Sequence, residues 1–197
     1  MIYEKTSERL LTADEGQLLL NLARLTIAAE LGIDCEKPSD LDRLLKIPVF
    51  AIKRGTFVTI KKAGDLRGCI GSLAANQPLA ENIRTNALNA AFRDPRFPPL
   101  TPDEWNQIQI EISVLTEPQK LDFSTGKELP ERLNPHVDGV ILRKGYVSAT
   151  FLPQVWKQLS RPEDFLAHLC LKAGWPADAW RRDRLEVETY QVQYFEE

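Results

Sequence analysis

Methionine, histidine and cysteine are all scarce in this sequence, which contains one, two and three of them. The cysteines Cys35, Cys69 and Cys170 are odd in number and far apart, which argues against a disulfide framework and for a reducing compartment. No apolar run approaches the roughly 20 residues of a membrane span. The N-terminus also lacks the apolar core of a secretory signal. We therefore expect a cytoplasmic protein without a membrane segment.

An excess of positive charge is missing as well, because 25 Lys and Arg face 28 Asp and Glu, for a net charge of −3. Without a positive field over the whole molecule, nonspecific nucleic-acid binding is disfavoured. The sequence also lacks the spacings of zinc, EF-hand, P-loop, dinucleotide and nucleophile-elbow sites. The common nucleotide-binding and hydrolase classes are therefore unsupported. No metal is predicted, and the sequence leaves the cofactor unknown.

Periodic patterns of both kinds are present along the 197 residues, a length that suits one domain or two small lobes. Strands come partly as hairpins and partly separated by helices. This mixture predicts an α+β fold with a mostly antiparallel sheet flanked by helices. We expect helices over about 13–31, 78–93 and 162–173, hairpins over 56–73 and 140–151, a strand at 108–114, and a last strand at about 185–195.

The most informative stretch is Leu66-Arg67-Gly68-Cys69-Ile70-Gly71. Strand alternation predicts that Arg67, Cys69 and Gly71 share one face, where Arg67 would favour the nucleophilic thiolate. Glycines in a strand often mark a bulge or the close approach of a backbone or ligand. The competing interpretation is that Cys69 is only a small packing residue, because free cysteines are among the most buried residues.

Other candidates for the same site come from distant segments. His136 lies in a turn two residues before Asp138, as a base and its orienting acid would, although an exposed turn histidine fits equally. Asp94 and Arg96 flank a proline in a stiff loop, which suits ligand binding or a simple surface ion pair. Glu111 is on the strand face opposite the isoleucines, either in a site or on a solvated face. We predict that these side chains line one concave site with Cys69.

The sequence resembles the AMMECR domain family, also called system protein A of the AmmeMemoRadiSam gene set. The resemblance runs in order through nearly the whole chain, and the string Leu-Arg-Gly-Cys-Ile-Gly is the signature of that family. The other matching segments include Phe57-Val58-Thr59-Ile60, Ala90-Ala91-Phe92-Arg93-Asp94-Pro95-Arg96-Phe97-Pro98-Pro99-Leu100, His136-Val137-Asp138-Gly139-Val140, Phe151-Leu152-Pro153-Gln154-Val155-Trp156 and Lys172-Ala173-Gly174-Trp175.

This resemblance implies one AMMECR-type domain over residues 1–197, with a larger and a smaller lobe and a cleft near Cys69. It implies no reaction, but it does imply two partners, a Memo-type protein and a radical SAM protein. Two functions remain open. The first is an enzyme or enzyme component that uses the Cys69 thiolate, with His136 and Glu111 as further catalytic candidates. The second is a noncatalytic module that binds a partner protein or a nucleotide-like ligand through Arg67, Gly68, Gly71, Asp94 and Arg96.

Overall fold

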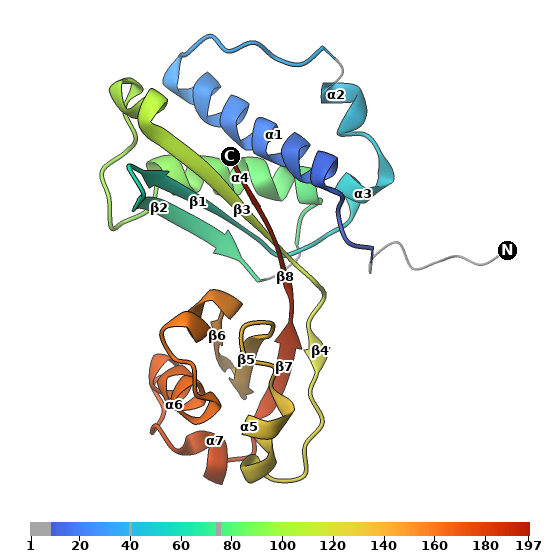
Figure 1. The fold of residues 1–197 in the computed structure, drawn as a ribbon, viewed down its shortest axis with the longest axis vertical. Helices are drawn as coiled ribbons and strands as arrows, with labels where there is room; N and C mark the ends of the chain where they lie inside the picture. Colours follow the sequence, from blue (N-terminus) through green and yellow to red (C-terminus); the bar gives the residue numbers. More distant parts are fainter. Residues whose placement is uncertain (1–8, 40, 74–75) are drawn as a thin grey trace, which may run out of the picture. The chain divides into compact units, whose positions relative to one another are not determined.

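The computed structural model describes residues 9–39, 41–73 and 76–197, and it divides into two compact units (Figure 1). Of the described residues, those up to 117 together with 193–197 form unit 1, and residues 118–192 form unit 2. Each unit has helices and its own four-stranded antiparallel sheet, so the predicted α+β class is confirmed. Within the described ranges, no helix combines the length and the apolar character that a membrane crossing requires.

The sheet of unit 1 has the strand order β2-β1-β3-β8. The strand β1 is central and pairs with a neighbour on each side, so that Val58 lies opposite both Ile70 and Ile112. The hairpin between β1 and β2 turns through Ala63 and Gly64, which both have positive φ, as a two-residue loop requires. The strand bounds are β1 Thr56–Lys62, β2 Asp65–Ser72, β3 Ile108–Leu115 and β8 Val192–Glu196.

Two long helices, α1 (Ala13–Leu31) and α4 (Leu79–Phe92), pack on each other and against the sheet of unit 1. The predicted capping box is present, because Thr12 and Glu15 bond each other's backbone N–H groups at the start of α1. The helix ends at Gly32, whose φ of 69° is left-handed. Two short helices, α2 (Leu41–Leu44) and α3 (Pro48–Ala51), connect α1 to the sheet.

Alternation along the strands divides the sheet of unit 1 into an apolar face and a polar face. The apolar face joins the helices in one core, which includes Leu19, Ile27, Val58, Ile60, Ile83, Ala87, Ile110 and Ile112. Residues between these positions, such as Thr59 and Glu111, belong to the polar face. The apolar pattern of the sequence therefore determines which strand residues lie on the polar face and are available for a functional site.

Unit 2 has a sheet of order β4-β7-β5-β6 and a separate core. Its centre is Trp156, whose ring stacks on Phe165 at 3.7 Å and whose Nε1 donates to the carbonyl of Asp138 at 2.7 Å. The strands are β4 Gln119–Lys120, β5 Gly139–Lys144, β6 Val147–Phe151 and β7 Glu186–Tyr190. The helices are α5 Leu129–Arg132, α6 Pro162–Lys172 and α7 Ala179–Arg182, with 3₁₀ turns η2 Gly126–Glu128 and η3 Pro153–Lys157.

The last predicted strand, at 185–195, is two strands in two different sheets. β7 belongs to unit 2, whereas the residues of β8 from Gln193 onward belong to unit 1. In unit 1 the ring of Phe195 lies against Gly16 of α1, where a Cβ atom would come within 2.0 Å of the ring. The alternating pattern continues across the break, so the sequence predicted the strands without predicting the change of sheet.

Candidate functional site

The thiol of Cys69 lies on the polar face of the sheet of unit 1. Its Sγ atom accepts a hydrogen bond from Oγ1 of Thr59 at 3.2 Å, and its side chain is half-buried. Cys69 is opposite Thr59 in the β2–β1 register, and Thr59 is opposite Glu111 in the β1–β3 register. The three side chains therefore form a row across three adjacent strands.

The row ends in a group of three ionisable side chains. Glu111 is 7% exposed and forms an ion pair with Lys61 from the central strand. Tyr194 of β8 hydrogen-bonds to Glu111, and partial burial together with this carboxylate raises the pKa of Tyr194 above its usual value. Glu111 is therefore buried in an ion pair rather than on a solvated face.

Asp94 and Arg96 hold the backbone of Cys69 from the free edge of β2. Oδ2 of Asp94 accepts from the Cys69 N–H at 2.9 Å, and Nη2 of Arg96 donates to the Cys69 carbonyl at 3.2 Å. Arg96 also binds Asp94 through Nε and Nη2, at 2.9 and 2.6 Å. The Arg96 hydrogen bonds hold the pKa of Asp94 well below its usual range. The sequence left open whether Asp94 and Arg96 bind a ligand or form a simple surface ion pair. In the structure the two side chains form a clamp that holds the backbone of Cys69.

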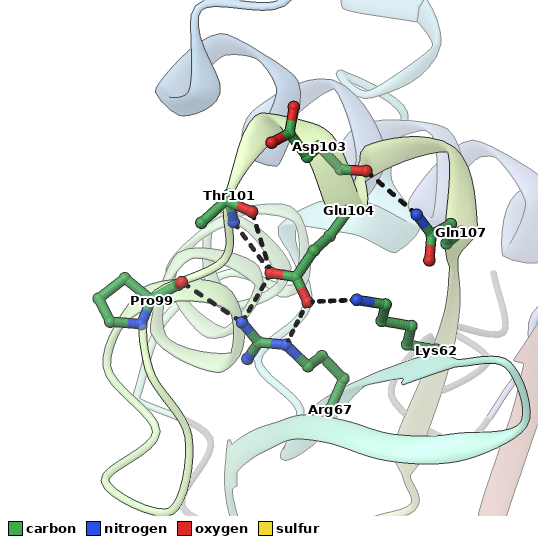
Figure 2. A network of polar contacts seen from close by, with 7 residues as sticks. All are labelled: Lys62, Arg67, Pro99, Thr101, Asp103, Glu104 and Gln107. Atoms are coloured by element: carbon green, nitrogen blue, oxygen red, sulfur yellow. Dashed lines mark hydrogen bonds and ion pairs between the residues drawn. The ribbon is translucent and has the colours of Figure 1, made fainter.

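Arg67 is the extra residue of a β-bulge. Ile60 pairs with Gly68 and Lys61 pairs with Leu66, so Arg67 has no opposite residue and the alternation breaks there. Its Nε and Nη2 bind the two carboxylate oxygens of Glu104, both at 2.9 Å, and Lys62 binds the same carboxylate at 3.0 Å (Figure 2). The prediction that Arg67 and Cys69 share a strand face is therefore corrected, because Arg67 turns toward Glu104 in the 3₁₀ turn η1 (Pro102–Gln107).

Close contacts with neighbouring atoms explain both glycines of the signature, Gly68 and Gly71. A Cβ atom on Gly68 would lie 2.1 Å from the carbonyl oxygen of Ala90 in α4, so β2 approaches that helix closely. A Cβ atom on Gly71 would lie 2.3 Å from the carbonyl oxygen of Thr56 and 2.4 Å from the ring of Phe57, its cross-strand neighbour. The predicted close approach by another backbone is thus present at both glycines.

His136 belongs to unit 2, whereas the other candidate residues belong to unit 1. It is exposed and has a φ of 68°, in a turn where the Asp138 N–H donates to the Asn134 carbonyl. Oδ2 of Asp138 accepts from the backbone N–H and from Nδ2 of Asn134, at 2.8 and 3.1 Å. This oxygen therefore closes the turn. The grouping of His136 with Cys69 stays a prediction.

The sequence did not identify four partners of the candidate residues, which are Thr59, Lys61, Glu104 and Tyr194. Thr59 and Lys61 are at alternate positions of β1, on the face of the sheet that carries Glu111. This alternation identifies them as neighbours of Glu111 once β1 and β3 are paired. Tyr194 has no local signal, since it reaches Glu111 from a strand more than 80 residues later in the chain. Among the residues that the structure describes, no three His, Cys, Asp or Glu side chains are grouped as a metal site would need.

Comparison with known proteins finds one family whose model spans both units. The model of the AMMECR1 family matches residues 20–195. Protein Mbar_A1807 of Methanosarcina barkeri is 42% identical, over 95% of this chain and 93% of its own, and Protein MJ0810 of Methanocaldococcus jannaschii is 38% identical, over 96% and 93%. The crystal structure of uncharacterized protein PH0010 from Pyrococcus horikoshii has 35% identity and a TM-score of 0.78, over 92% of this chain and 91% of that one.

Proposed function

This chain belongs to the AMMECR1 family, and we propose that it acts as an enzyme or enzyme component through the thiol of Cys69. Cys69 is the nucleophile or the covalent carrier in this proposal. Glu111, with Lys61 and Tyr194, supplies acid–base groups two strands away. The proposal concerns the site, because family membership brings no established reaction.

The observation that carries the proposal is the way Cys69 is held. Its Sγ accepts a hydroxyl hydrogen bond from Thr59, while its backbone N–H and C=O are bound by Asp94 and Arg96. A packing cysteine needs no hydroxyl donor at its sulfur, because apolar neighbours suffice. A nucleophile needs a fixed position and a donor that favours the thiolate. The arrangement therefore supports a reactive role more than a packing role.

The alternative is the noncatalytic binding module. It relies on Arg67 and Arg96 as anion-binding residues, but Arg67 already binds the carboxylate of Glu104 through Nε and Nη2. Arg67 is only 11% exposed, and its bidentate pair with Glu104 is a typical structural ion pair. These contacts argue against Arg67 as an anion-binding residue of such a module.

Alkylation of the native protein with iodoacetamide tests the proposal. We expect Cys69 to react faster than Cys35 or Cys170 at neutral pH, and Cys170 slowest, because burial raises the pKa of its thiol. Peptide mass spectrometry over a pH series measures the three rates. Cys69→Ser and Thr59→Val serve as variants, the second to remove the hydroxyl donor at similar volume. If native Cys69 stays unlabelled while Cys35 labels, the thiol function is refuted and the binding module takes its place.

The family resemblance adds a proposal about partners. We propose that this protein associates with a Memo-type protein, which is similar to extradiol dioxygenases, and with a radical SAM protein. A stable interface buries at least about 1,000 Å². Coexpression followed by pull-down at low salt would recover a complex with one or both partners. Failure with both, tested with and without their metals and SAM, would exclude a stable association.

A further inference from the structure

Arg96 has hydrogen-bond donors beyond those that the clamp uses. Nε and Nη2 bind Asp94, and Nη2 also binds the carbonyl of Cys69. Nη1, which has two N–H donors, takes part in none of these bonds. The side chain of Arg96 is 53% exposed, whereas that of its partner Asp94 is 2% exposed. The buried carboxylate therefore fixes a guanidinium whose other end is open to solvent.

The clamp also fixes this open end in direction. Two hydrogen bonds to Asp94 hold the plane of the guanidinium, and its Cζ atom lies 5.5 Å from the ring centroid of Phe97. A charge that is already ordered loses little entropy when it binds a ligand. Nη2 of Arg96 lies 3.2 Å from the carbonyl oxygen of Cys69, so the cation is held next to the residue that carries the thiol.

From this geometry we infer that the molecule that reacts with Cys69 carries an anionic group, a carboxylate or a phosphate, and that Nη1 of Arg96 binds it. The inference rests on the thiol function proposed above and names the substrate class of that same site. Arg96 is well suited to this role because a negative substrate would otherwise be repelled by the thiolate. Arg67 cannot replace Arg96, since the bulge directs it to Glu104.

The reaction to be measured is a simple displacement with two reagents of matched size. In both, the Cys69 sulfur forms a bond to the methylene carbon, the carbon–iodine bond breaks, and iodide leaves with the electron pair, while the thiol proton goes to solvent. Iodoacetate carries a carboxylate and iodoacetamide a neutral amide. The ratio of their rates at one pH therefore reports binding of the negative charge and cancels differences in the thiolate fraction.

The first arm uses the native protein with glutathione as the reference thiol. We expect the iodoacetate to iodoacetamide rate ratio at Cys69 to exceed that of glutathione by about threefold to tenfold, as one nearby and partly solvated cation would produce. Inorganic phosphate at constant ionic strength should lower the ratio by competing for Nη1. This arm needs no substitution, so it does not depend on how a variant folds.

The second arm uses variants. Arg96→Gln should return the ratio to the glutathione value, and Arg96→Lys should keep part of the preference because the charge remains. Arg93→Gln is the matched control, since Arg93 is an exposed arginine three residues away that binds Asn89 and should leave the ratio unchanged. Circular dichroism checks that each variant is folded.

The outcomes separate the inference from the proposed function. Fast labelling of Cys69 by iodoacetamide without any preference for iodoacetate keeps the thiol function and refutes the anionic substrate. A preference that survives Arg96→Gln assigns anion binding to another group and also refutes the role of Arg96. Slow labelling of Cys69 by both reagents, with Cys35 reacting first, overturns the thiol function and with it this inference.

Discussion

The carboxylate of Asp94 accepts a hydrogen bond from the backbone N–H of Cys69 at 2.9 Å, although 25 residues separate the two in the chain. β2 is an edge strand, so this N–H points away from the sheet. Edge strands expose such groups to water or to other chains unless something covers them. Asp94 and Arg96 occupy the positions of a missing neighbour strand at one residue, and that residue is the candidate nucleophile.

Asp94→Asn should destabilise unit 1. The change weakens the acceptor for Cys69 and leaves Arg96 without its charge partner, and breaking a buried polar network typically costs about 2–4 kcal/mol. Urea unfolding followed by circular dichroism measures the loss. Asp103→Asn, at an exposed position in the 3₁₀ turn η1 (Pro102–Gln107), is the matched control and should change stability little. Equal stabilities for the two variants would show that Asp94 does not support the fold.

Glu104 should make stability depend on pH. The hydrogen bonds from Arg67, with further bonds from Lys62 and Thr101, lower the pKa of Glu104 to about 2. Because the folded pKa is below the unfolded one, the contribution of this carboxylate is complete above about pH 4.5. It is lost as the pH falls toward 2, and solvent screening limits it to at most about 2 kcal/mol.

Stability curves between pH 2 and pH 6 test this. Glu104→Gln should lower stability at pH 6 and remove part of the acid-induced decline, because the variant has no proton to gain there. Glu81→Gln is a suitable control, since Glu81 forms an exposed pair with Arg84 within α4. An unchanged slope in Glu104→Gln would contradict the assignment.

Gly68→Ala should destabilise the protein by about 1–3 kcal/mol, the usual cost of an overpacked site. The added Cβ would lie 2.1 Å from the carbonyl oxygen of Ala90, which is backbone and cannot rotate away. Ala90→Gly should therefore fail to rescue the variant, and chemical unfolding of the single and double variants measures this. Rescue by Ala90→Gly would show that side-chain crowding, rather than the approach of the α4 backbone, requires the glycine.

Tyr194 should titrate above the usual tyrosine range. Its pKa is raised by partial burial and by the hydrogen bond to Glu111, and Glu111→Gln removes the negative charge, so the midpoint should fall in that variant. Phenolate absorbance measures the midpoint, with Tyr194→Phe to identify its signal. Burial also raises the pKa of Tyr190, to about 12, so the variants are needed to tell the two signals apart. If the midpoint does not change in Glu111→Gln, the carboxylate of Glu111 does not raise the pKa of Tyr194.

The sequence predicted most of the elements because they follow from local patterns. Thr12 with Glu15 marked the start of α1, and the alternation around Ile110 and Ile112 marked β3. These signals depend on residues a few positions apart, so one sequence is enough to recognise them. The family was also recognisable from its signature, and the match over residues 20–195 confirms it.

The site was less predictable, since its contacts join distant segments. The bulge at Arg67 leaves no trace in the apolar pattern, and it moved that side chain from Cys69 to Glu104. The roles of Asp94 and Arg96 depend on a loop meeting an edge strand. Local periodicity identifies the face of a side chain, but a one-residue change of register redirects it.

Because β8 belongs to the sheet of unit 1, it affects the order in which parts of the protein can fold during synthesis. Most of unit 1 precedes unit 2 in the chain, yet the residues of β8 from Gln193 onward follow it. Gln193 and Phe195 contribute contacts to Leu11 and Gly16. During vectorial synthesis a ribosome completes every residue of unit 2 before the sheet of unit 1 can close. The edge of β3, the strand that carries Glu111, therefore stays uncovered until β8 has been synthesised.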